Sequence, residues 1–363
     1  MIDQKTQRGL TRRSMLTLTG GAALGALAAP SILRAETKIG GELYLETFGG
    51  SYAEAVTNII VKPFEERYGV KVHISQFGNN AEVLAKLQAG NSRVDVSTLG
   101  GGEVYLAAKN KILRPLNLSN IPNFAQQHDK FRKPNYELGD TNNFSAGLVW
   151  GDRAIAYNFD SIDEAPTSWE ALWDPRFAGI SSAYLPFPGP IEIGALVLGQ
   201  DMNNISDLDA IEKKLMELKG NLLKWWSSGS ELTQLFAMGE VAISDFWRGR
   251  VNTMKEQGLP VDYVVPQEGA PSWVDTMVVP KTCQNVPAAE AFINTMLDAE
   301  IQRQFVLHGI NYAPSNIETK LTENEKIRLG ASENIFDTAI FADAAYVASQ
   351  ANDWNLVLNR LKS

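Results

Sequence analysis

Trp273 and Asp275 are the residues whose types and spacing most clearly suggest a chemical role. They lie two positions apart within residues 266–280, PQEGAPSWVDTMVVP, so an extended backbone would point both side chains to the same side. The face of an aromatic ring attracts a cation, and a carboxylate neutralises it through charge-assisted hydrogen bonds. The pair therefore predicts a receptor for an organic ammonium ion. The structural alternative is that Trp273 packs in a core and Asp275 caps a turn.

The elements that would position this pair follow from the pattern of apolar residues. Strands are expected on both sides of it, at 261–265 and 276–279, with turn residues between them. Earlier strands alternate with helices that begin near Tyr52, near Ala81 and at Glu103. These earlier strands are predicted at 42–47, 70–76 and 94–98. The resulting β-α-β-α-β order predicts a parallel sheet covered by helices.

The rest of the chain supplies further strands and helices. A long strand is expected over 144–159, a short one over 239–244, and a short helix over 166–179. Longer helices are predicted over 205–219, 231–238, 288–308 and most of 322–361. Pro63 should kink or end the helix that begins near Tyr52. A chain that leaves a first α/β lobe, builds a second and returns would create a ligand cleft between them.

Five stretches resemble the periplasmic spermidine/putrescine-binding protein family. They are PQEGAPSWVDTMVVP itself, TFGGSYAEA after the first strand, SWEALWDPRFAG, the MGEVAI run, and NYAPSN near the end. The resemblance implies an α/β fold of the two-lobed periplasmic binding protein kind (type II-like). Each lobe would be a mixed, mostly parallel sheet flanked by helices, with the ligand cleft at the hinge. One lobe would hold residues 36–148 plus about 276–322, and the other 149–275 plus about 323–363.

The resemblance also implies which residues contact the ligand. Trp273 and Asp275 match the family's amine-binding pair, and Trp247 matches a pocket tryptophan. Phe48 stands where the spermidine protein has a tryptophan, which keeps an aromatic wall with a smaller ring. Tyr312, in the NYAPSN stretch, is a further expected ligand contact. These residues would form the amine-binding part of the site.

One segment departs from the family pattern and leaves the ligand class open. The family's further acidic residues should fall in 184–191, but this segment reads YLPFPGPI and has no acid, although Glu192 follows it. Arg248, directly after Trp247, could bind a ligand carboxylate in a bidentate way. The alternative for Arg248 and Arg250 is solvent exposure or an internal salt bridge. An amine-bearing carboxylate therefore competes with a polyamine.

Two glycine turns could also contact an anionic group. Gly49-Gly50-Ser51 and Gly100-Gly101-Gly102 each follow a predicted strand and present backbone N–H groups where a helix begins. Thr47, Ser51 and Gly101 are accordingly candidate ligand contacts. The alternative is that both stretches are simply tight turns.

The N-terminal residues predict export to the periplasm. Residues 1–35 combine a basic head, an apolar stretch over 15–29 and a plausible cleavage site, as in a signal peptide. TRRSML, at 11–16, resembles a twin-arginine signal, with an ordinary secretory signal as the alternative. Removing this segment, of net charge +4, from a chain of −9 leaves about −13. An acidic surface suits cationic ligands and disfavours nucleic acid.

Composition and motifs argue against an enzyme. The 363 residues are 44% hydrophobic, enough for two domains with buried cores, and the single Cys283 excludes an intrachain disulfide. The three histidines lack metal-ligand spacing, and the chain has neither a GxSxG elbow nor a phosphate-loop lysine. We therefore expect no catalytic residue, no cofactor and no metal.

These observations lead to one predicted function and three alternatives. The prediction is a monomeric substrate-binding component of an ABC importer, which delivers a small amine-containing solute to permease subunits in the inner membrane. One alternative is a ligand-sensing receptor for a membrane sensor. The others are the same fold with ferric iron or a thiamine-like ligand, although no adjacent pair of tyrosines supports iron.

Overall fold

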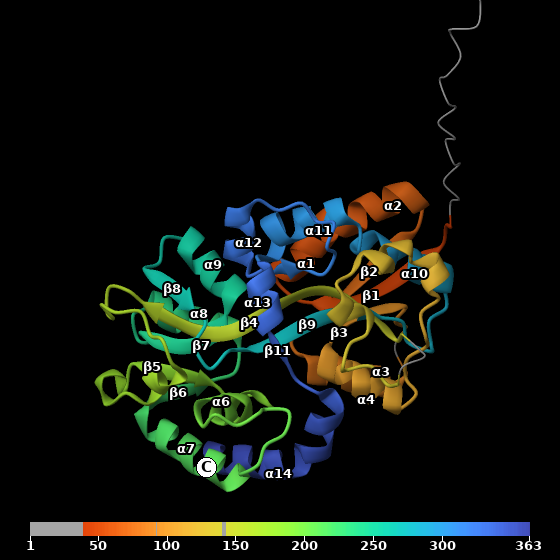
Figure 1. Cartoon of the computed structure of the whole chain (residues 1–363). Helices are drawn as coiled ribbons and strands as arrows, with labels where there is room; N and C mark the ends of the chain where they lie inside the picture. The colour runs from red at the N-terminus through yellow and green to blue at the C-terminus, as the bar shows by residue number, and fades with distance from the viewer. Residues whose placement is uncertain (1–38, 92, 140–142) are drawn as a thin grey trace, which may run out of the picture. The chain divides into compact units, whose positions relative to one another are not determined.

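Two strands, β4 (Ser145–Asn158) and β9 (Pro271–Val278), run through the middle of one mixed β-sheet. The computed structural model describes residues 39–363 except 92 and 140–142, and Figure 1 shows these strands connecting the two ends of the sheet. The remaining strands are β1 (Glu42–Phe48), β2 (Lys71–Phe77), β3 (Val96–Gly100), β5 (Ser181–Tyr184), β6 (Leu222–Trp226), β7 (Ile243–Trp247), β8 (Val261–Val264), β10 (Ala313–Pro314) and β11 (Ile340–Phe341). The order is β2-β1-β3-β9-β4-β7-β5-β6, with β8 and β10 paired to β4 and β11 to β9.

The predicted β-α-β-α-β unit is present at the N-terminal end of the described chain. Strand β1 pairs in parallel with β2 and with β3. Strand β9 returns from much later in the sequence and pairs antiparallel with β3. The sheet is therefore mixed, and β9 places Asp275 opposite Gly100, the last residue of β3.

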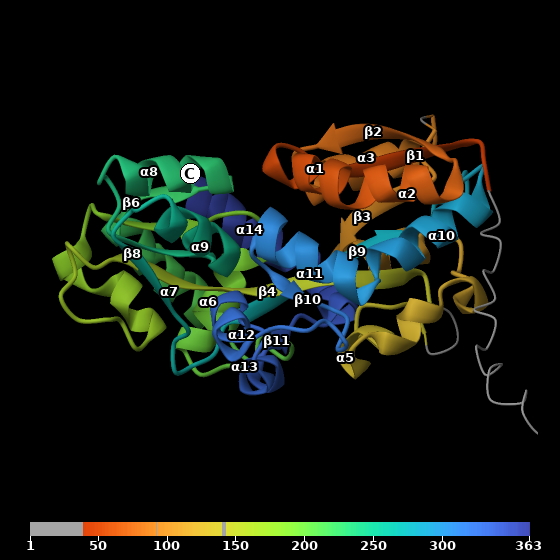
Figure 2. The ribbon, with the colours of Figure 1, turned by 90° about the horizontal axis from the view of Figure 1, so that it is seen from above.

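Helices cover both faces at each end of the sheet. They are α1 (Ser51–Ala55), α2 (Lys62–Tyr68), α3 (Asn80–Ala89), α4 (Gly101–Lys109), α5 (Asp129–Arg132), α6 (Gly189–Val197), α7 (Leu208–Asn221), α8 (Gly229–Ala237), α9 (Arg248–Glu256), α10 (Val286–Met296), α11 (Ala299–Phe305), α12 (Glu323–Leu329), α13 (Glu333–Thr338) and α14 (Ala344–Lys362). Around β1–β3, helices α1, α2, α10 and α11 pack on one face, and α3 and α4 on the other (Figures 1 and 2). Around β5–β7, helices α6, α7 and α14 cover one face, and α8 and α9 the other.

The alternation of side chains along β9 decides which layer each residue joins. Val274 and Val278 are buried in the layer with α3 and α4, whereas Met277 is buried in the layer with α10 and α11. Trp273 packs against the same layer as Met277. Asp275, two positions from Trp273 and from Met277, lies on that face as well, because successive strand residues alternate. The prediction that Trp273 and Asp275 share one side is confirmed.

Three predicted boundaries were wrong. The strand expected at 276–279 begins at Pro271, so Trp273 and Asp275 lie inside it and not in a turn. The helix expected over 288–308 breaks before Asp298, whose side chain caps α11 by accepting from two backbone N–H groups. Of the two effects expected of Pro63, a kink or an end of the helix, the end is not found. Pro63 lies in the first turn of α2, after a π-helical segment (Val56–Val61), where a missing N–H is tolerated.

Other elements had no clear signal in the sequence. Strands β5 and β6 and helix α6 were not predicted, and the short strand expected over 239–244 is β7, Ile243–Trp247. The segment 166–179, predicted as a short helix, forms two 3-10 turns, Trp169–Trp173 and Pro175–Phe177. Strand β7 ends in Trp247, so this tryptophan is positioned by the sheet.

The division into two lobes stays a prediction. By their internal contacts, residues Lys38–Ser363 group as one unit. Leu329 of α12 and Phe336 of α13 pack in the layers around β1–β3, whereas Trp354 and Leu361 of α14 pack beside β5–β7. The C-terminal segment thus contributes to the cores at both ends of the sheet.

Strand β4 changes its neighbour between two oppositely charged residues. It pairs with β9 up to Asp152 and with β7 from Arg153 onward. Arg153 is buried, bonds the carboxylate of Asp245 on β7, and donates to Glu192 of α6 at 2.8 Å. Glu192, the acid that follows the acid-free segment 184–191, is therefore neutralised by an internal arginine.

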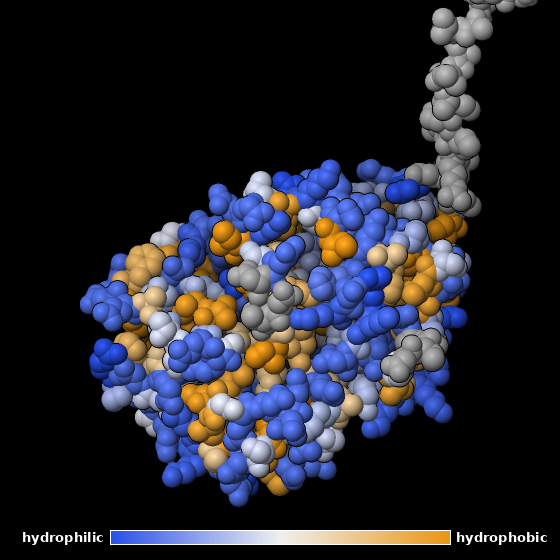
Figure 3. All heavy atoms as spheres, in the orientation of Figure 1, coloured by the Kyte–Doolittle hydropathy of each residue, from blue (hydrophilic) through white to orange (hydrophobic). Residues whose placement is uncertain are grey.

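The predicted signal peptide lies outside the described residues. In the described part of the chain, every helix is too short or too polar to cross a bilayer. Figure 3 shows hydrophilic side chains over most of one face, with hydrophobic side chains in small groups among them. The abundance of charged residues, 21% of the chain, accounts for this hydrophilic cover.

We predict that Arg153→Leu destabilises the protein by roughly 3–5 kcal/mol, because it leaves two buried carboxylates without their cation. Urea unfolding measures the loss. Arg176→Leu is the control, since Arg176 pairs with Asp174 at the surface and should change stability by less than about 1 kcal/mol. Equal, small effects of the two substitutions would contradict a stabilising role for the buried ion-pair network.

Candidate ligand-binding site

Strand β9 positions the predicted pair between β3 and β4. Asp275 lies opposite Gly100 of β3, and Trp273 lies opposite Gly151 of β4. A Cβ on Gly151 would come within 2.8 Å of the Trp273 ring, so glycine is required there for the ring to lie over the strand. Tyr312 meets the same ring edge-on at 4.6 Å between centroids. Trp273, Asp275 and Tyr312 are thus brought together, as the sequence predicted.

Asp275 is buried without a positively charged partner. It is 8% exposed, and burial raises the pKa of its carboxyl to about 7. The Tyr52 hydroxyl acts to lower this pKa and the carboxylate of Glu103 to raise it further, and no cation of the described chain acts on it. The Tyr52 oxygen faces Asp275 but has no partner at full hydrogen-bond geometry. The carboxyl is therefore about half protonated at neutral pH.

Glu103 is a site residue that the sequence reasoning missed. It lies in the first turn of α4, and its Oε2 is 2.6 Å from where a Cβ on Gly100 would be. Burial raises the pKa of Glu103. Its charge acts on Asp275 and also on Tyr184 of β5. Its position directly after the glycine turn 100–102 could have marked Glu103 as a candidate ligand contact. The sequence analysis named it only as the start of a helix.

A second aromatic group comes from the other end of the sheet. Trp247, the last residue of β7, lies edge-on to Trp226 at 5.1 Å and to Tyr184 at 5.5 Å. The backbone of Gly249 packs directly against the Tyr312 ring, and this contact joins the two aromatic groups. Trp247 thus lies near the predicted pair, and Tyr184 is a further aromatic residue that the sequence did not single out.

Phe48 and the glycine turns have different surroundings. Phe48 meets the Tyr52 ring edge-on at 5.3 Å, so it belongs to the Asp275 side of the site. Thr47 is buried and its hydroxyl has no hydrogen-bond partner among the described residues. Ser51 is exposed at the start of α1. Gly101 packs against the Tyr136 ring, which fits the structural alternative for this turn.

Arg248 has an internal partner instead of a free guanidinium. Its Nε donates to Asp152 at 2.9 Å, a second nitrogen bonds the other carboxylate oxygen, and the group lies over the Tyr263 ring. Tyr263 also donates to Asp152 at 3.0 Å, and Gly330 packs against the guanidinium. Asp152 therefore takes the bidentate position that was proposed for a ligand carboxylate. The alternative prediction for Arg248, an internal salt bridge, is confirmed.

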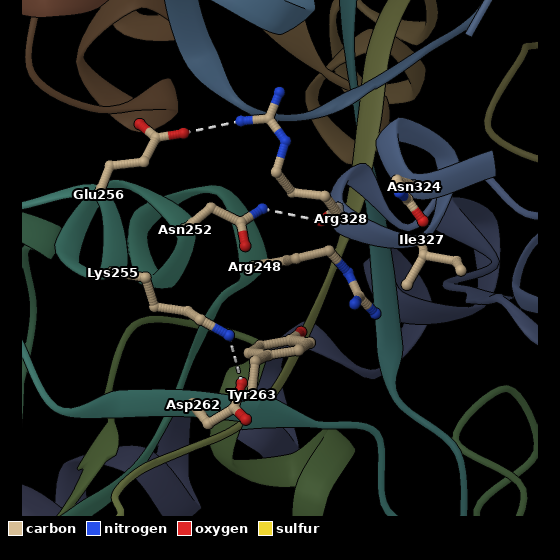
Figure 4. A pocket seen from close by; sticks show the side chains of 9 residues that line it. All are labelled: Arg248, Asn252, Lys255, Glu256, Asp262, Tyr263, Asn324, Ile327 and Arg328. Atoms are coloured by element: carbon tan, nitrogen blue, oxygen red, sulfur yellow. Dashed lines mark hydrogen bonds and ion pairs between the residues drawn. The ribbon is translucent and has the colours of Figure 1, made fainter. Parts of the chain in front are cut away.

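Arg248 also lines a separate pocket. Figure 4 shows this pocket between α9, β8 and α12, where the ion pairs Lys255–Asp262 and Arg328–Glu256 are among the side chains that line it. Of the predicted ligand contacts, only Arg248 lines it. The pocket is therefore distinct from the group of side chains around Trp273 and Asp275.

The shifted pKa of Asp275 predicts how the stability of the unliganded protein depends on pH. A folded-state pKa of about 7, against about 3.9 unfolded, means that this group loses stability as pH rises from about 4 through 7. Asp275→Asn mimics the protonated acid, so the variant should be more stable than the wild type at pH 8, by on the order of 4 kcal/mol, and equal to it at pH 4.

Urea unfolding of both proteins at the two pH values checks this. Asp174→Asn is the control, because its hydrogen bonds from Arg176 lower the pKa of Asp174. That variant should be less stable than the wild type at pH 8. A destabilised Asp275→Asn at pH 8 would mean that the ionised carboxylate has a cation partner in the folded protein.

Comparison with known proteins extends the resemblance over most of the chain. The family model of bacterial extracellular solute-binding proteins matches residues 60–327. Spermidine/putrescine-binding periplasmic protein 1 of Haemophilus influenzae is 29% identical over 317 residues, 86% of each chain. The gamma-aminobutyric acid-binding protein of Pseudomonas aeruginosa is 26% identical over 278 residues, 74% of this chain and 75% of that one.

Comparison of structures gives relatives of the same kind. The structure of the spermidine/putrescine ABC transporter substrate-binding protein PotD from Streptococcus pneumoniae superposes with a TM-score of 0.75 at 24% identity, covering 89% of this chain and 100% of that one. The predicted α/β periplasmic-binding-protein fold is confirmed. The proteins of the matched family bind solutes outside the cytoplasm and are not enzymes, which agrees with the predicted location and class. Because its model spans well over half of the sequence, this chain belongs to the family of bacterial extracellular solute-binding proteins.

Proposed function

We propose that the protein is the periplasmic substrate-binding component of an ABC importer and that Asp275 holds an amine of its solute. The observation that carries this proposal is the buried Asp275 carboxyl, which has aromatic side chains around it and no cation of the described chain beside it. A solute ammonium would supply the missing positive charge and lower the pKa of the carboxyl. The face of Trp273 would stabilise the same cation.

Unpaired polar atoms on β9, α1 and β1 support a ligand there. The Trp273 indole nitrogen, the Tyr52 hydroxyl and the Thr47 hydroxyl are buried without a hydrogen-bond partner in the described chain. Buried polar groups are normally paired, so three of them on neighbouring elements indicate a site for a polar solute. Phe48 and Tyr312 would form its aromatic walls.

The relatives support an amine without deciding the rest of the solute. Two of them are named for spermidine and putrescine binding, and one for gamma-aminobutyric acid binding. All three of these solutes carry a primary amine, which is the group that Asp275 would bind. One of these relatives is also named as part of an ABC transporter, which supports the importer over a sensor.

The two aromatic groups suggest how capture would work. Trp273 and Phe48 belong to the end of the sheet with β1–β3, whereas Trp247 and Tyr184 belong to the end with β5–β7. We propose that these ends are the two lobes and that the solute draws them together, with β4 and β9 as the hinge strands. The permease would then recognise the closed form.

A polyamine is a second candidate because of Glu103. This carboxylate lies beside Gly100, near Asp275, and it also acts on Tyr184. It could hold a second ammonium in place of the acids missing from residues 184–191. A polyamine site would therefore need both Asp275 and Glu103.

We predict that Asp275→Ala lowers affinity for an amine-bearing solute more than tenfold without loss of stability, because the variant lacks the carboxylate that pairs with the ammonium beside Trp273. Thermal unfolding against putrescine, spermidine, basic amino acids and small amino-carboxylates identifies the solute first. A solute at a hundred times its Kd adds about 2.7 kcal/mol to the stability of the wild type. Wild-type affinity in Asp275→Ala would remove Asp275 from the site.

Binding should also depend on pH. Below pH 7 the protonated Asp275 has to lose its proton before it can pair with an ammonium. The affinity should therefore decrease as pH is lowered, by up to roughly tenfold for each pH unit. Calorimetric titration with the identified solute at pH 8, 7 and 6 measures this. Asp275→Asn should bind weakly at all three values. An affinity for the wild type that is constant over this range would contradict the proposed role of the carboxyl.

A further inference from the structure

Arg250 extends from α9 to the point where the two aromatic groups meet. Its guanidinium lies close enough to the hydroxyl of Tyr312 to lower the pKa of that hydroxyl. A Cβ on Gly229 would lie 3.2 Å from Nε of Arg250 and 3.1 Å from the ring of Trp247, so both side chains approach the first turn of α8. Arg250 therefore lies near one aromatic residue from each end of the sheet, Tyr312 and Trp247.

The charge of Arg250 has no internal counterion. Within the described chain it forms no ion pair, and the residue is exposed. The acids on neighbouring elements are already paired with other cations. These pairs are Asp152 with Arg248, Asp245 and Glu192 with Arg153, Glu231 with Lys224, and Glu256 with Arg328. Arg250 is thus a free cation beside the candidate site, in contrast to Arg248.

The site consequently has a negative end and a positive end. Asp275 lies opposite Gly100 on the neighbouring strand, the Glu103 carboxylate lies beside Gly100, and the two acids form the negative end. The Tyr312 ring contacts Trp273 at 4.6 Å between centroids, and the charges of both Asp275 and Arg250 act on its hydroxyl, so both charged groups lie near Tyr312. A solute that extends from Asp275 past the Tyr312 ring would therefore reach a guanidinium.

We propose that Arg250 binds an anionic group of the solute, so that the physiological solute is an amino-carboxylate. This inference rests on the proposed function and adds the second end of the same site. The ammonium lies at Asp275 and Trp273, and the carboxylate accepts hydrogen bonds from Arg250 beside Tyr312 and Trp247. A diamine in the same orientation would place its second ammonium against Arg250, and like charges at that distance repel.

The test uses solutes that share one carbon chain. The purified wild type and Arg250→Gln are titrated calorimetrically with 4-aminobutanoate, butylamine, butanoate and putrescine, and with the six-carbon equivalents. For the wild type, the amino-carboxylate should bind most tightly. Arg250→Gln should weaken the amino-carboxylate roughly ten- to a hundredfold, the range expected for a lost charged hydrogen bond, and leave the monoamine within about twofold.

Two further variants serve as controls. Arg176→Gln removes an exposed arginine away from these residues and should change no affinity. Arg250→Lys keeps the charge without the forked geometry and should restore part of the amino-carboxylate affinity. Thermal unfolding of each variant without solute verifies that an exposed position has been changed without loss of fold.

Three other outcomes would contradict the role of Arg250, the class of solute or the proposed function. If Arg250→Gln lowers the affinities for butylamine and 4-aminobutanoate equally, Arg250 supports the aromatic side chains and does not bind a carboxylate. Preferred binding of putrescine, lost in Glu103→Gln and improved in Arg250→Gln, would replace the amino-carboxylate by a polyamine and leave the proposed function intact. Binding of none of the amines would overturn the proposed function itself.

Discussion

A buried carboxylate without a cation is the feature on which the candidate site depends. Ionising Asp275 in its apolar surroundings is unfavourable, so its pKa rises to about 7 and the empty site carries only part of a negative charge. The chain pairs comparable carboxylates elsewhere: Asp152 with Arg248 and Asp245 with Arg153. Asp275 differs from these two acids because no cation of the described chain acts on it. Destabilised groups of this kind are typical of binding sites, where the missing partner is supplied by the ligand.

The ion pairs of β4 explain how the rest of the site is held. Asp152 and Arg153 are adjacent, and strand alternation sends their side chains to opposite faces, where one binds α9 and the other binds β7 and α6. Both faces of the strand are thus fixed at the place where it changes neighbour. The pair with Asp152 also fixes Arg248, the first residue of α9. Arg250 lies two residues further along the helix, about 200° around its axis, and so points towards Tyr312.

Local patterns predicted what depends on neighbours in the sequence. Alternation along the strand placed Trp273 and Asp275 on one side, although the strand was expected to begin only at 276. The helix expected to begin near Ala81 is α3, and its start depends on Asn79, whose side chain accepts from the backbone N–H of Glu82 three positions later. Sequence patterns failed where a distant segment decides the structure. Strand β6 has exposed Leu223 and Lys224 in its middle and is specified by its pairing with β5.

The sequence by itself determined the class of protein, the α/β fold and the aromatic and acidic residues that could receive an amine. Short-range periodicity suffices for the α/β fold because it reflects backbone conformation, whereas the class of protein and most of the candidate contacts followed from the resemblance to a known family. Only the tertiary structure decided which charges are free. Arg248 and Arg250 are equivalent in the sequence, yet one is neutralised by Asp152, 96 residues away, and the other is not. Pairing and burial, which shift pKa values and leave a charge for the ligand, depend on distances between segments that are remote in the chain.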